Sequence, residues 1–347
     1  MNHVRMEGLF AATVTPFDSD GRLRLDQVNP IVEHLQADGL AGIYICGSTG
    51  EGVSLRDDER RATSEAYVRA AAGRLKTFIQ VGHNSLSAAR DLAVHAQAIG
   101  ADAVSATCPS YFKIDSAAML VEAMAQVAAG APGLPFYYYH IPALTNVNLD
   151  MMQFIEMAES RIPTFAGLKF TTPAAHDFQM CLEHKQRRYD ALWGVDEMLL
   201  PALAVGARGA VGSTYNVAAP IALKIIASFE SGDIQEARRW QLRLNKAIRT
   251  LLSFPFLAAL KQTLSWLAAD CGSCRLPLQS LSNEQAKRLR EELETMEFFE
   301  WRRRDTGVSR RVDGSSATAA HPPGAHRPAS AAPGLPRDSR VATQRDG

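Results

Sequence analysis

Eight short apolar runs recur through the first two thirds of the chain, each bounded by Gly or Pro and rich in β-branched or aromatic residues. Their apolarity is nearly continuous, which is typical of strands buried on both faces of a parallel sheet, whereas an exposed antiparallel face would alternate. The pattern therefore predicts eight strands, within residues 9–17, 41–47, 77–82, 101–109, 134–142, 164–170, 191–195 and 206–216.

Stretches with apolar residues at a spacing of three and four lie between most of these runs, for example 55–75 and 85–100. Acids or Ser stand near their starts, as is typical of amphipathic helices. A strand followed by a helix, eight times at a spacing of roughly 20 to 35 residues, predicts an α/β protein with a (β/α)8 TIM barrel. A doubly wound open sheet is the alternative, but the Gly-x-Gly-x-x-Gly fingerprint is missing from the first strand-to-helix turn.

The chain divides into three predicted parts. Residues 1–216 form the barrel core, and residues 217–302 form further helices packed on the barrel, including those expected at 254–269 and 283–299. Residues 303–347 contain no aromatic, Ile or Met and carry eight Arg against four Asp, a net charge of +4. Such a segment cannot bury enough surface to offset its ordering entropy, so we expect a disordered, solvated tail rather than a binding arm.

Composition narrows the function classes. The chain has 37 Lys and Arg residues and 37 Asp and Glu residues, so it has no excess positive charge that would attract nucleic acid. No nucleic-acid partner is expected. The first residues lack an apolar signal core, and no run reaches the roughly 18 apolar residues of a membrane span. We therefore expect a soluble, cytoplasmic protein without a membrane partner.

The five cysteines, an odd number, imply no disulfide framework. Cys271 and Cys274 form a Cys-x-x-Cys pair, but a structural zinc site needs four ligands and no second pair or His cluster stands nearby. We interpret them as two incidental thiols in a loop rather than as a metal or redox site.

In a barrel of this type the reactive groups come from the carboxyl ends of the strands. The polar residues that follow the predicted strands are therefore the candidates for chemistry. They are Thr15, 47–52, His83, Asn84, 109–111, Tyr139, Lys169, Asp196, Glu197 and 213–216.

Lys169 is the most informative candidate, because it alone of eight lysines lies inside a strand-like apolar run. A buried ammonium needs either a partner or a shift of its pKa toward neutrality. Lowering the pKa by roughly three units would make this amine a usable nucleophile at pH 7. The alternative is a lysine at a strand end that extends to solvent and pairs with an acid.

Two neighbours of Lys169 favour the nucleophile. Tyr139 ends the preceding strand, and adjacent strands lie about 4.8 Å apart, so its phenol can reach the amine. Alternation places Tyr137 and Tyr139 on one face of that strand and Tyr138 on the other. The glycine-rich loop (residues 47–52) offers backbone N–H groups that suit a carboxylate or phosphate, although it lacks the Gly-Lys-Ser/Thr of a nucleotide-binding loop. Together these groups suit a small keto acid.

Three motifs carry a resemblance to a known family: Gly-Ser-Thr-Gly-Glu at 47–51, Tyr-x-x-Pro at 139–142 and Gly-Leu-Lys at 167–169. The chain resembles the pyruvate-dependent class I aldolase family of N-acetylneuraminate lyase and dihydrodipicolinate synthase, over roughly residues 7–300. It is most similar to the lyase branch, and to its animal form, through PFYYYHIPALT at 135–145, GLKF at 167–170, GVDE at 194–197 and GAVGSTYN at 209–216.

The resemblance implies a carbon–carbon lyase that cleaves N-acetylneuraminate reversibly to N-acetylmannosamine and pyruvate. Lys169 would form the Schiff base, so no cofactor is expected, and Tyr139 would relay the proton. Ser48 and Thr49 match the positions that hold the substrate carboxylate. The positions that bind the sugar chain correspond to Thr171, Gly194, Asp196, Glu197 and Ser213.

The resemblance also bears on assembly and on the choice between branches. Tyr111 and Thr49 would orient Tyr139, with Tyr111 reaching across a subunit interface of a homotetramer. The synthases carry an arginine for a second carboxylate where this chain has Leu144, and a neutral sugar aldehyde does not require that charge.

Other functions stay open at this point. They are an aldolase or hydratase of another 2-keto sugar acid, and a barrel that binds sugars without turnover. A metal-dependent aldolase is less well supported, because the nine histidines are scattered and only His83 and His140 stand near strand ends.

Overall fold

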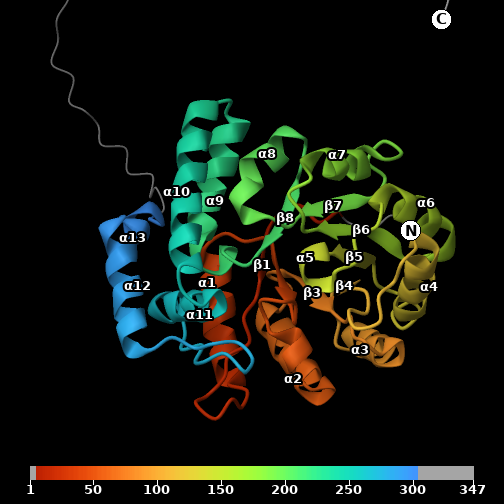
Figure 1. Cartoon of the computed structure of the whole chain (residues 1–347), viewed down its shortest axis with the longest axis horizontal. Helices are drawn as coiled ribbons and strands as arrows, with labels where there is room; N and C mark the ends of the chain where they lie inside the picture. Colours follow the sequence, from red (N-terminus) through yellow and green to blue (C-terminus); the bar gives the residue numbers. More distant parts are fainter. Residues whose placement is uncertain (1–4, 304–347) are drawn as a thin grey trace, which may run out of the picture. The chain divides into compact units, whose positions relative to one another are not determined.

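The computed structural model describes residues 5–303, and its eight parallel strands close into a barrel in sequence order (Figure 1). Each strand begins inside its predicted run or one residue before it. The first strand pairs with the eighth, so the predicted TIM barrel is confirmed and the open sheet is excluded. The strands are β1 (Gly8–Ala12), β2 (Gly42–Ile45), β3 (Lys76–Gln80), β4 (Ala103–Ala106), β5 (Phe136–His140), β6 (Phe165–Phe170), β7 (Asp190–Trp193) and β8 (Gly209–Gly212).

Helices follow every strand and cover the outside of the barrel. Polar side chains begin several of them: Ser85 accepts a hydrogen bond from the N–H of Ala88, and Asp150 accepts one from the N–H of Met152. The helices are α1 (Val28–Ala37), α2 (Asp57–Ala71), α3 (Leu86–Ala98), α4 (Ala117–Ala128), α5 (Pro142–Thr145), α6 (Met151–Arg161), α7 (Ala175–Glu183), α8 (Leu199–Ala204) and α9 (Tyr215–Glu230). Short 3-10 turns are η1 (Leu25–Gln27), η2 (Gly52–Ser54) and η3 (Asp196–Met198).

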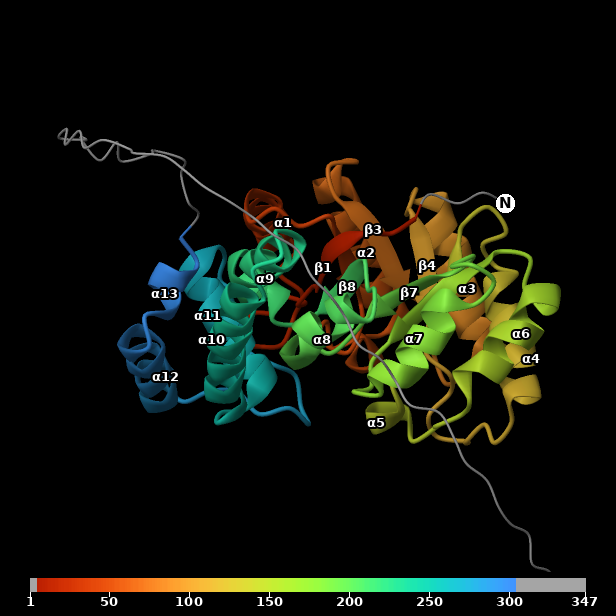
Figure 2. The ribbon, with the colours of Figure 1, turned by 90° about the horizontal axis from the view of Figure 1, so that it is seen from above.

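Four further helices gather on the side of the barrel that α9 covers (Figures 1 and 2). They are α10 (Ile234–Leu252), α11 (Phe256–Leu267), α12 (Asn283–Thr295) and α13 (Phe298–Trp301). Helix α10 packs along α9, and α11 contacts both of them.

One of the two predicted boundaries of the chain can be compared with this arrangement. Helix α9 crosses the predicted boundary at 216/217, because it begins at Tyr215 and packs against β1. The predicted tail, apart from Arg303, lies outside the described residues. Between residues 5 and 303, no helix has both the length and the apolarity needed to cross a membrane.

Two apolar cores result from the alternation of side chains along the strands. The larger one lies between the strands and the helices and includes Tyr138, whereas the smaller one fills the barrel and includes Tyr44, Phe78, Tyr137 and Tyr139. The three consecutive tyrosines thus divide between the faces as alternation predicts.

A one-residue irregularity sets the position of Lys169. Phe136 pairs with Phe165 but Tyr137 pairs with Gly167, so β6 has one additional residue at this point. Because an inserted residue changes the face on which later side chains lie, Lys169 comes opposite Tyr139 with both side chains inside the barrel. A methyl group at Gly167 would overlap the backbone of Asp190 in β7, so only glycine fits here.

We expect the substitution Gly167→Ala to destabilise the barrel and to disturb the register that carries Lys169. Overpacking of this kind lowers the free energy of unfolding by about 1–3 kcal/mol. Urea denaturation measures the loss. Gly133→Ala is the matched control, because a methyl group there meets only the flexible side chain of Gln97. Equal stability of the two variants would contradict the role given to Gly167.

Candidate active site

Lys169 lies near the carboxyl end of β6, and only 3% of its surface is exposed. Its Nζ atom lies 3.9 Å from the ring centroid of Tyr44 and 4.0 Å from that of Tyr139. Burial lowers the pKa of Lys169 to about 7, and the carboxylate of Asp196 opposes this shift. The side chain does not extend to solvent, and about half of the amine is neutral at pH 7 and able to act as a nucleophile.

Tyr139 pairs in register with Lys169 and is equally buried. Burial raises the pKa of Tyr139 to about 12, an increase that the hydroxyls of Ser48 and Thr171 oppose. The phenol is therefore protonated at neutral pH. It is a weak base by itself, but it can donate a proton or pass one between two other groups.

The glycine-rich loop turns sharply through its own backbone hydrogen bonds. The N–H of Gly52 donates to the carbonyl of Gly47, and Thr15 donates from its hydroxyl to the carbonyl of Gly50 over 2.6 Å. Within this loop the side chain of Ser48 is exposed at the surface, whereas that of Thr49 is buried. The loop can thus present a hydroxyl together with backbone N–H groups to an anion.

Thr49 makes a different contact from the expected one. Its hydroxyl is hydrogen bonded to the hydroxyl of Ser213, 2.6 Å away, which ties the loop after β2 to the end of β8. The hydroxyls that oppose the increase in the pKa of Tyr139 are those of Ser48 and Thr171. The expectation that Thr49 orients Tyr139 stays a prediction, because a hydroxyl bonded to Ser213 can still make a further hydrogen bond.

Asp196 is buried at the start of η3, where one carboxylate oxygen accepts hydrogen bonds from the N–H and the hydroxyl of Thr214 at 2.9 and 2.6 Å. Burial raises the pKa of Asp196 to about 6, and the two bonds from Thr214 oppose this increase. A methyl group at Gly212 would overlap the carboxylate, so the glycine makes room for it.

Three other predicted residues lie in the loops after β6 and β7. Glu197 follows it in η3 and is partly buried. Gly194 donates its N–H to the carbonyl of Phe170, and a methyl group there would overlap the hydroxyl of Thr171. The loops after β6 and β7 therefore meet in direct contact near the lysine.

Tyr111 is the predicted site residue that the described chain does not bring to the others. Its side chain is 78% exposed and packs edge to face against Phe112, with ring centroids 5.1 Å apart. Within residues 5–303 its hydroxyl makes no hydrogen bond. A role for Tyr111 across a subunit interface stays a prediction.

Sequence reasoning missed Tyr44, whose ring covers one side of the Lys169 amine. Its hydroxyl donates to the hydroxyl of Ser105 over 2.9 Å, which holds the ring inside the barrel. The only available signal was one aromatic residue in the run 41–47, and a tyrosine in a buried strand is more often simple packing. Thr214, the partner of Asp196, was also given no role.

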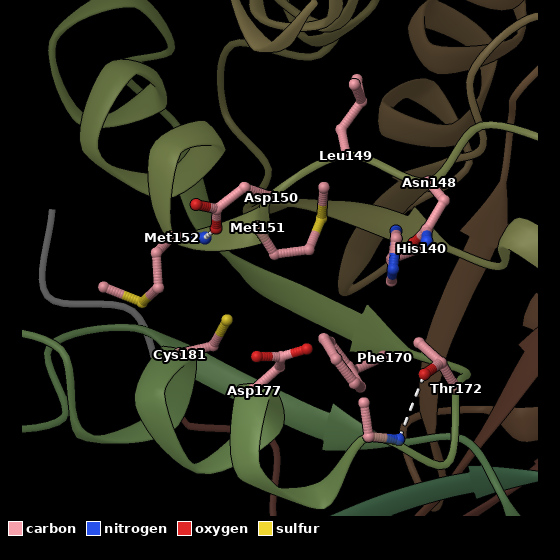
Figure 3. Close-up of a pocket in the computed structure, with 11 residues that line it drawn as sticks. His140, Asn148, Leu149, Asp150, Met151, Met152, Phe170, Thr172, Asp177 and Cys181 are labelled. Atoms are coloured by element: carbon pink, nitrogen blue, oxygen red, sulfur yellow. Dashed lines mark hydrogen bonds between the residues drawn. The ribbon is translucent and has the colours of Figure 1, made fainter.

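A groove of about 360 Å³ lies on the other side of β5 and β6, outside the barrel (Figure 3). His140 lines it together with Phe170, Asp177 and Cys181, and burial lowers the pKa of His140 to about 4. The other histidine near a strand end, His83, accepts a hydrogen bond from the N–H of Ser85. In the described part of the chain, no three His, Cys, Asp or Glu side chains are grouped as a metal site would need.

Comparisons with known proteins identify chains and structures that are similar to this one. Residues 5–296 match the model of the dihydrodipicolinate synthetase family. The N-acetylneuraminate lyase of Xenopus tropicalis is 42% identical over 280 residues, which cover 80% of this chain and 92% of that protein. Two solved structures align with a TM-score of 0.83 over 85% of this chain. The N-acetylneuraminate lyase of Proteus mirabilis is 36% identical and fully covered. The sialic acid aldolase of Aliivibrio salmonicida is 39% identical, with 98% covered.

The lowered pKa of Lys169 predicts how imine formation depends on pH. Only the neutral amine adds to a carbonyl, so the rate of borohydride trapping of a 2-keto acid should rise about tenfold per pH unit below pH 7 and level off above it. Asp196→Asn removes a carboxylate that favours the ammonium form, so the pKa of Lys169 falls and the rise moves to lower pH.

Both statements are tested by trapping rates measured from about pH 5 to about pH 10. This range extends roughly two units or more on either side of the pKa. Asp177→Asn, in the exposed part of α7, is the control and should leave the profile unchanged. A midpoint near the usual lysine value of about 10.4 would contradict the assigned ionisation.

Proposed function

Because the chain belongs to the dihydrodipicolinate synthetase family, we propose that it is a carbon–carbon lyase that cleaves N-acetylneuraminate reversibly to N-acetylmannosamine and pyruvate. The observation that carries this proposal is the buried amine of Lys169, with a pKa near 7, beside the phenol of Tyr139. The lyase relatives, similar over most of the chain, support the choice of substrate.

The proposed reaction begins at Lys169. The neutral amine attacks the ketone carbon of the open-chain substrate, and loss of water gives an iminium ion. The positive iminium withdraws the electron pair of the bond between the next two carbons, so that bond breaks and an enamine forms on Lys169. Protonation of the enamine and hydrolysis of the imine release pyruvate. No separate cofactor takes part, because the lysine supplies the covalent attachment.

Tyr139 is the proposed proton relay. As the carbon–carbon bond breaks, the hydroxyl on the departing carbon loses its proton and becomes the aldehyde of N-acetylmannosamine. A phenol with a pKa of about 12 cannot hold a negative charge easily, so it gives its own proton to a second group as it takes the proton of the substrate hydroxyl. The substrate carboxylate is the acceptor we propose, since it lies next to the imine carbon.

The remaining residues bind the two ends of the substrate in this scheme. Ser48 and Thr49, with the N–H groups of the glycine-rich loop, hold the carboxylate. The carboxylates of Asp196 and Glu197 accept hydrogen bonds from the hydroxyls of the sugar chain, as polyol binding requires. Thr171, Gly194 and Ser213 complete this side of the site.

Leu144 supports a neutral aldehyde over one with a second carboxylate. It lies in α5, directly after the strand that carries Tyr139, and 59% of its side chain is exposed. A leucine offers no hydrogen bond or charge to a carboxylate, whereas an arginine there would bind one through two hydrogen bonds. An aldolase of another neutral 2-keto sugar acid is the second candidate, since its substrate would meet the same residues.

The proposed enzyme is a cytoplasmic homotetramer. Tyr111 and Phe112 support assembly, because two adjacent aromatic side chains that are 78% and 82% exposed suit contact with a second copy. Light scattering after gel filtration measures the mass of the assembly. A monomer in solution, with full activity, would contradict both the tetramer and the role proposed for Tyr111.

Purified protein incubated with N-acetylneuraminate should release pyruvate and N-acetylmannosamine in equal amounts, and Lys169→Ala should abolish release because no imine can form. Borohydride with pyruvate should attach the ligand to the peptide that contains Lys169, as read by mass spectrometry. Lys76→Ala is the matched control, because this lysine is exposed at the start of β3 and pairs with Asp102. Retained activity in Lys169→Ala, or faster turnover of another 2-keto acid, would replace the proposal.

A further inference from the structure

Helices α10 and α11 reach both loops that bind the substrate in the proposed function, through two separate buried contacts. Lys261 of α11 contacts Glu51 in the glycine-rich loop, and Gln241 of α10 contacts the segment 196–200. We propose that Lys261 and Gln241 are positioning residues: Lys261 holds the loop for the substrate carboxylate, and Gln241 holds the loop for the sugar chain. This inference rests on the proposed function and deepens it.

The contact of Lys261 is an ion pair without solvent exposure. Its Nζ lies 2.6 Å from Oε1 of Glu51, donates to the carbonyl of Ser273 over 2.9 Å and lies 4.3 Å from the ring centroid of Phe17. The second carboxylate oxygen of Glu51 accepts the N–H of Arg275 over 2.9 Å. Helix α11 and the segment after it therefore hold both oxygens of the carboxylate.

The position of Glu51 affects the carboxylate-binding hydroxyl directly. Glu51 has a φ of 54°, in the left-handed region that is unfavourable for a residue with a side chain unless surrounding contacts hold it. Its N–H donates to the carbonyl of Ser48 over 3.1 Å. Movement of Glu51 would therefore displace Ser48, three residues earlier.

A second contact from the same segment strengthens this arrangement. The guanidinium of Arg275 forms a bidentate pair with Glu59, at 2.7 and 2.8 Å, in the first turn of α2. It also donates to the carbonyl of Gly21 over 2.9 Å. The glycine-rich loop is thus fixed at Glu51, and the helix that follows it at Glu59, by residues that lie more than 200 positions later in the chain.

The contact of Gln241 involves a different helix and a different loop. Its side-chain oxygen accepts the N–H of Leu200 over 2.8 Å, and its side-chain nitrogen donates to the carbonyl of Asp196 over 3.3 Å and to Asn245 over 2.9 Å. Thr214 holds the carboxylate of Asp196, so Gln241 fixes only the backbone that carries it. Two hydrogen bonds from one amide span both ends of the segment 196–200.

The test is a pair of variants with opposite effects on the two substrates of the condensation direction. Lys261→Met should raise the KM for pyruvate about tenfold or more and leave the KM for N-acetylmannosamine unchanged, whereas Gln241→Leu should do the reverse. In both variants kcat should change less than the affected KM, because Lys169 and Tyr139 stay in place. A merely structural loss would lower the melting temperature and the active fraction but move neither KM.

Matched controls are available on the neighbouring surface of α10. Lys246→Met and Gln235→Leu make the same changes at exposed positions and should leave both constants at their wild-type values. Should Lys261→Met fail to fold, Glu51→Gln/Lys261→Met removes the whole ion pair, leaves no buried charge unpaired and should raise the same KM. Equal changes in both constants in each variant, or no change in a folded variant, would overturn the proposal.

Hydrogen–deuterium exchange separates this inference from the proposed function. Lys261→Met should speed exchange in residues 47–54 but not in 196–200, and Gln241→Leu in residues 196–200 but not in 47–54, whatever the substrate is. If the variants show these changes but the wild-type protein does not turn over N-acetylneuraminate, the lyase is rejected and the positioning roles are kept. Unchanged exchange in both loops of an active lyase would reject the positioning roles alone.

Discussion

An uncharged lysine amine inside the mouth of the barrel is the condition on which the proposed chemistry depends. Water would keep the amine protonated, and a nearby carboxylate favours the same form. Burial between the rings of Tyr44 and Tyr139 outweighs the effect of Asp196 and brings the pKa of Lys169 to about 7. Closure of the barrel makes this possible, because the interior of a closed sheet is filled by side chains from several strands.

Different parts of the fold carry the different groups of the site. Strand ends carry the proposed reacting groups, the loops after β2, β7 and β8 carry proposed binding groups, and the C-terminal helices contact two of these loops. Close packing sets the spacing: glycines at 194 and 212 leave room for Thr171 and Asp196. In this arrangement the helices beyond the barrel are part of the site, although none of their side chains is proposed to touch the substrate.

The positions of the eight strands could be predicted because parallel strands buried on both faces have a continuous apolar pattern that few other structures share. Lys169 could be singled out because a charge inside such a run is costly and therefore unusual. The same argument applied to the apolar helical stretch 254–269 would have found Lys261, which is fully buried. Its partner could not have been named, because Glu51 lies 210 positions away and no local pattern links the two.

The sequence by itself determined the barrel, the candidate for the nucleophile and the set of polar residues at the strand ends, because hydrophobic periodicity and a buried charge are local properties. The tertiary structure decided what the hydroxyls affect: Thr49 bonds to Ser213, while Ser48 and Thr171 oppose the increase in the pKa of Tyr139. The additional residue in β6 decided the face on which Lys169 lies. The closed barrel also placed the ring of Tyr44 over the amine. These outcomes depend on register and on contacts between distant segments, which only the closed barrel brings within a few ångströms of one another.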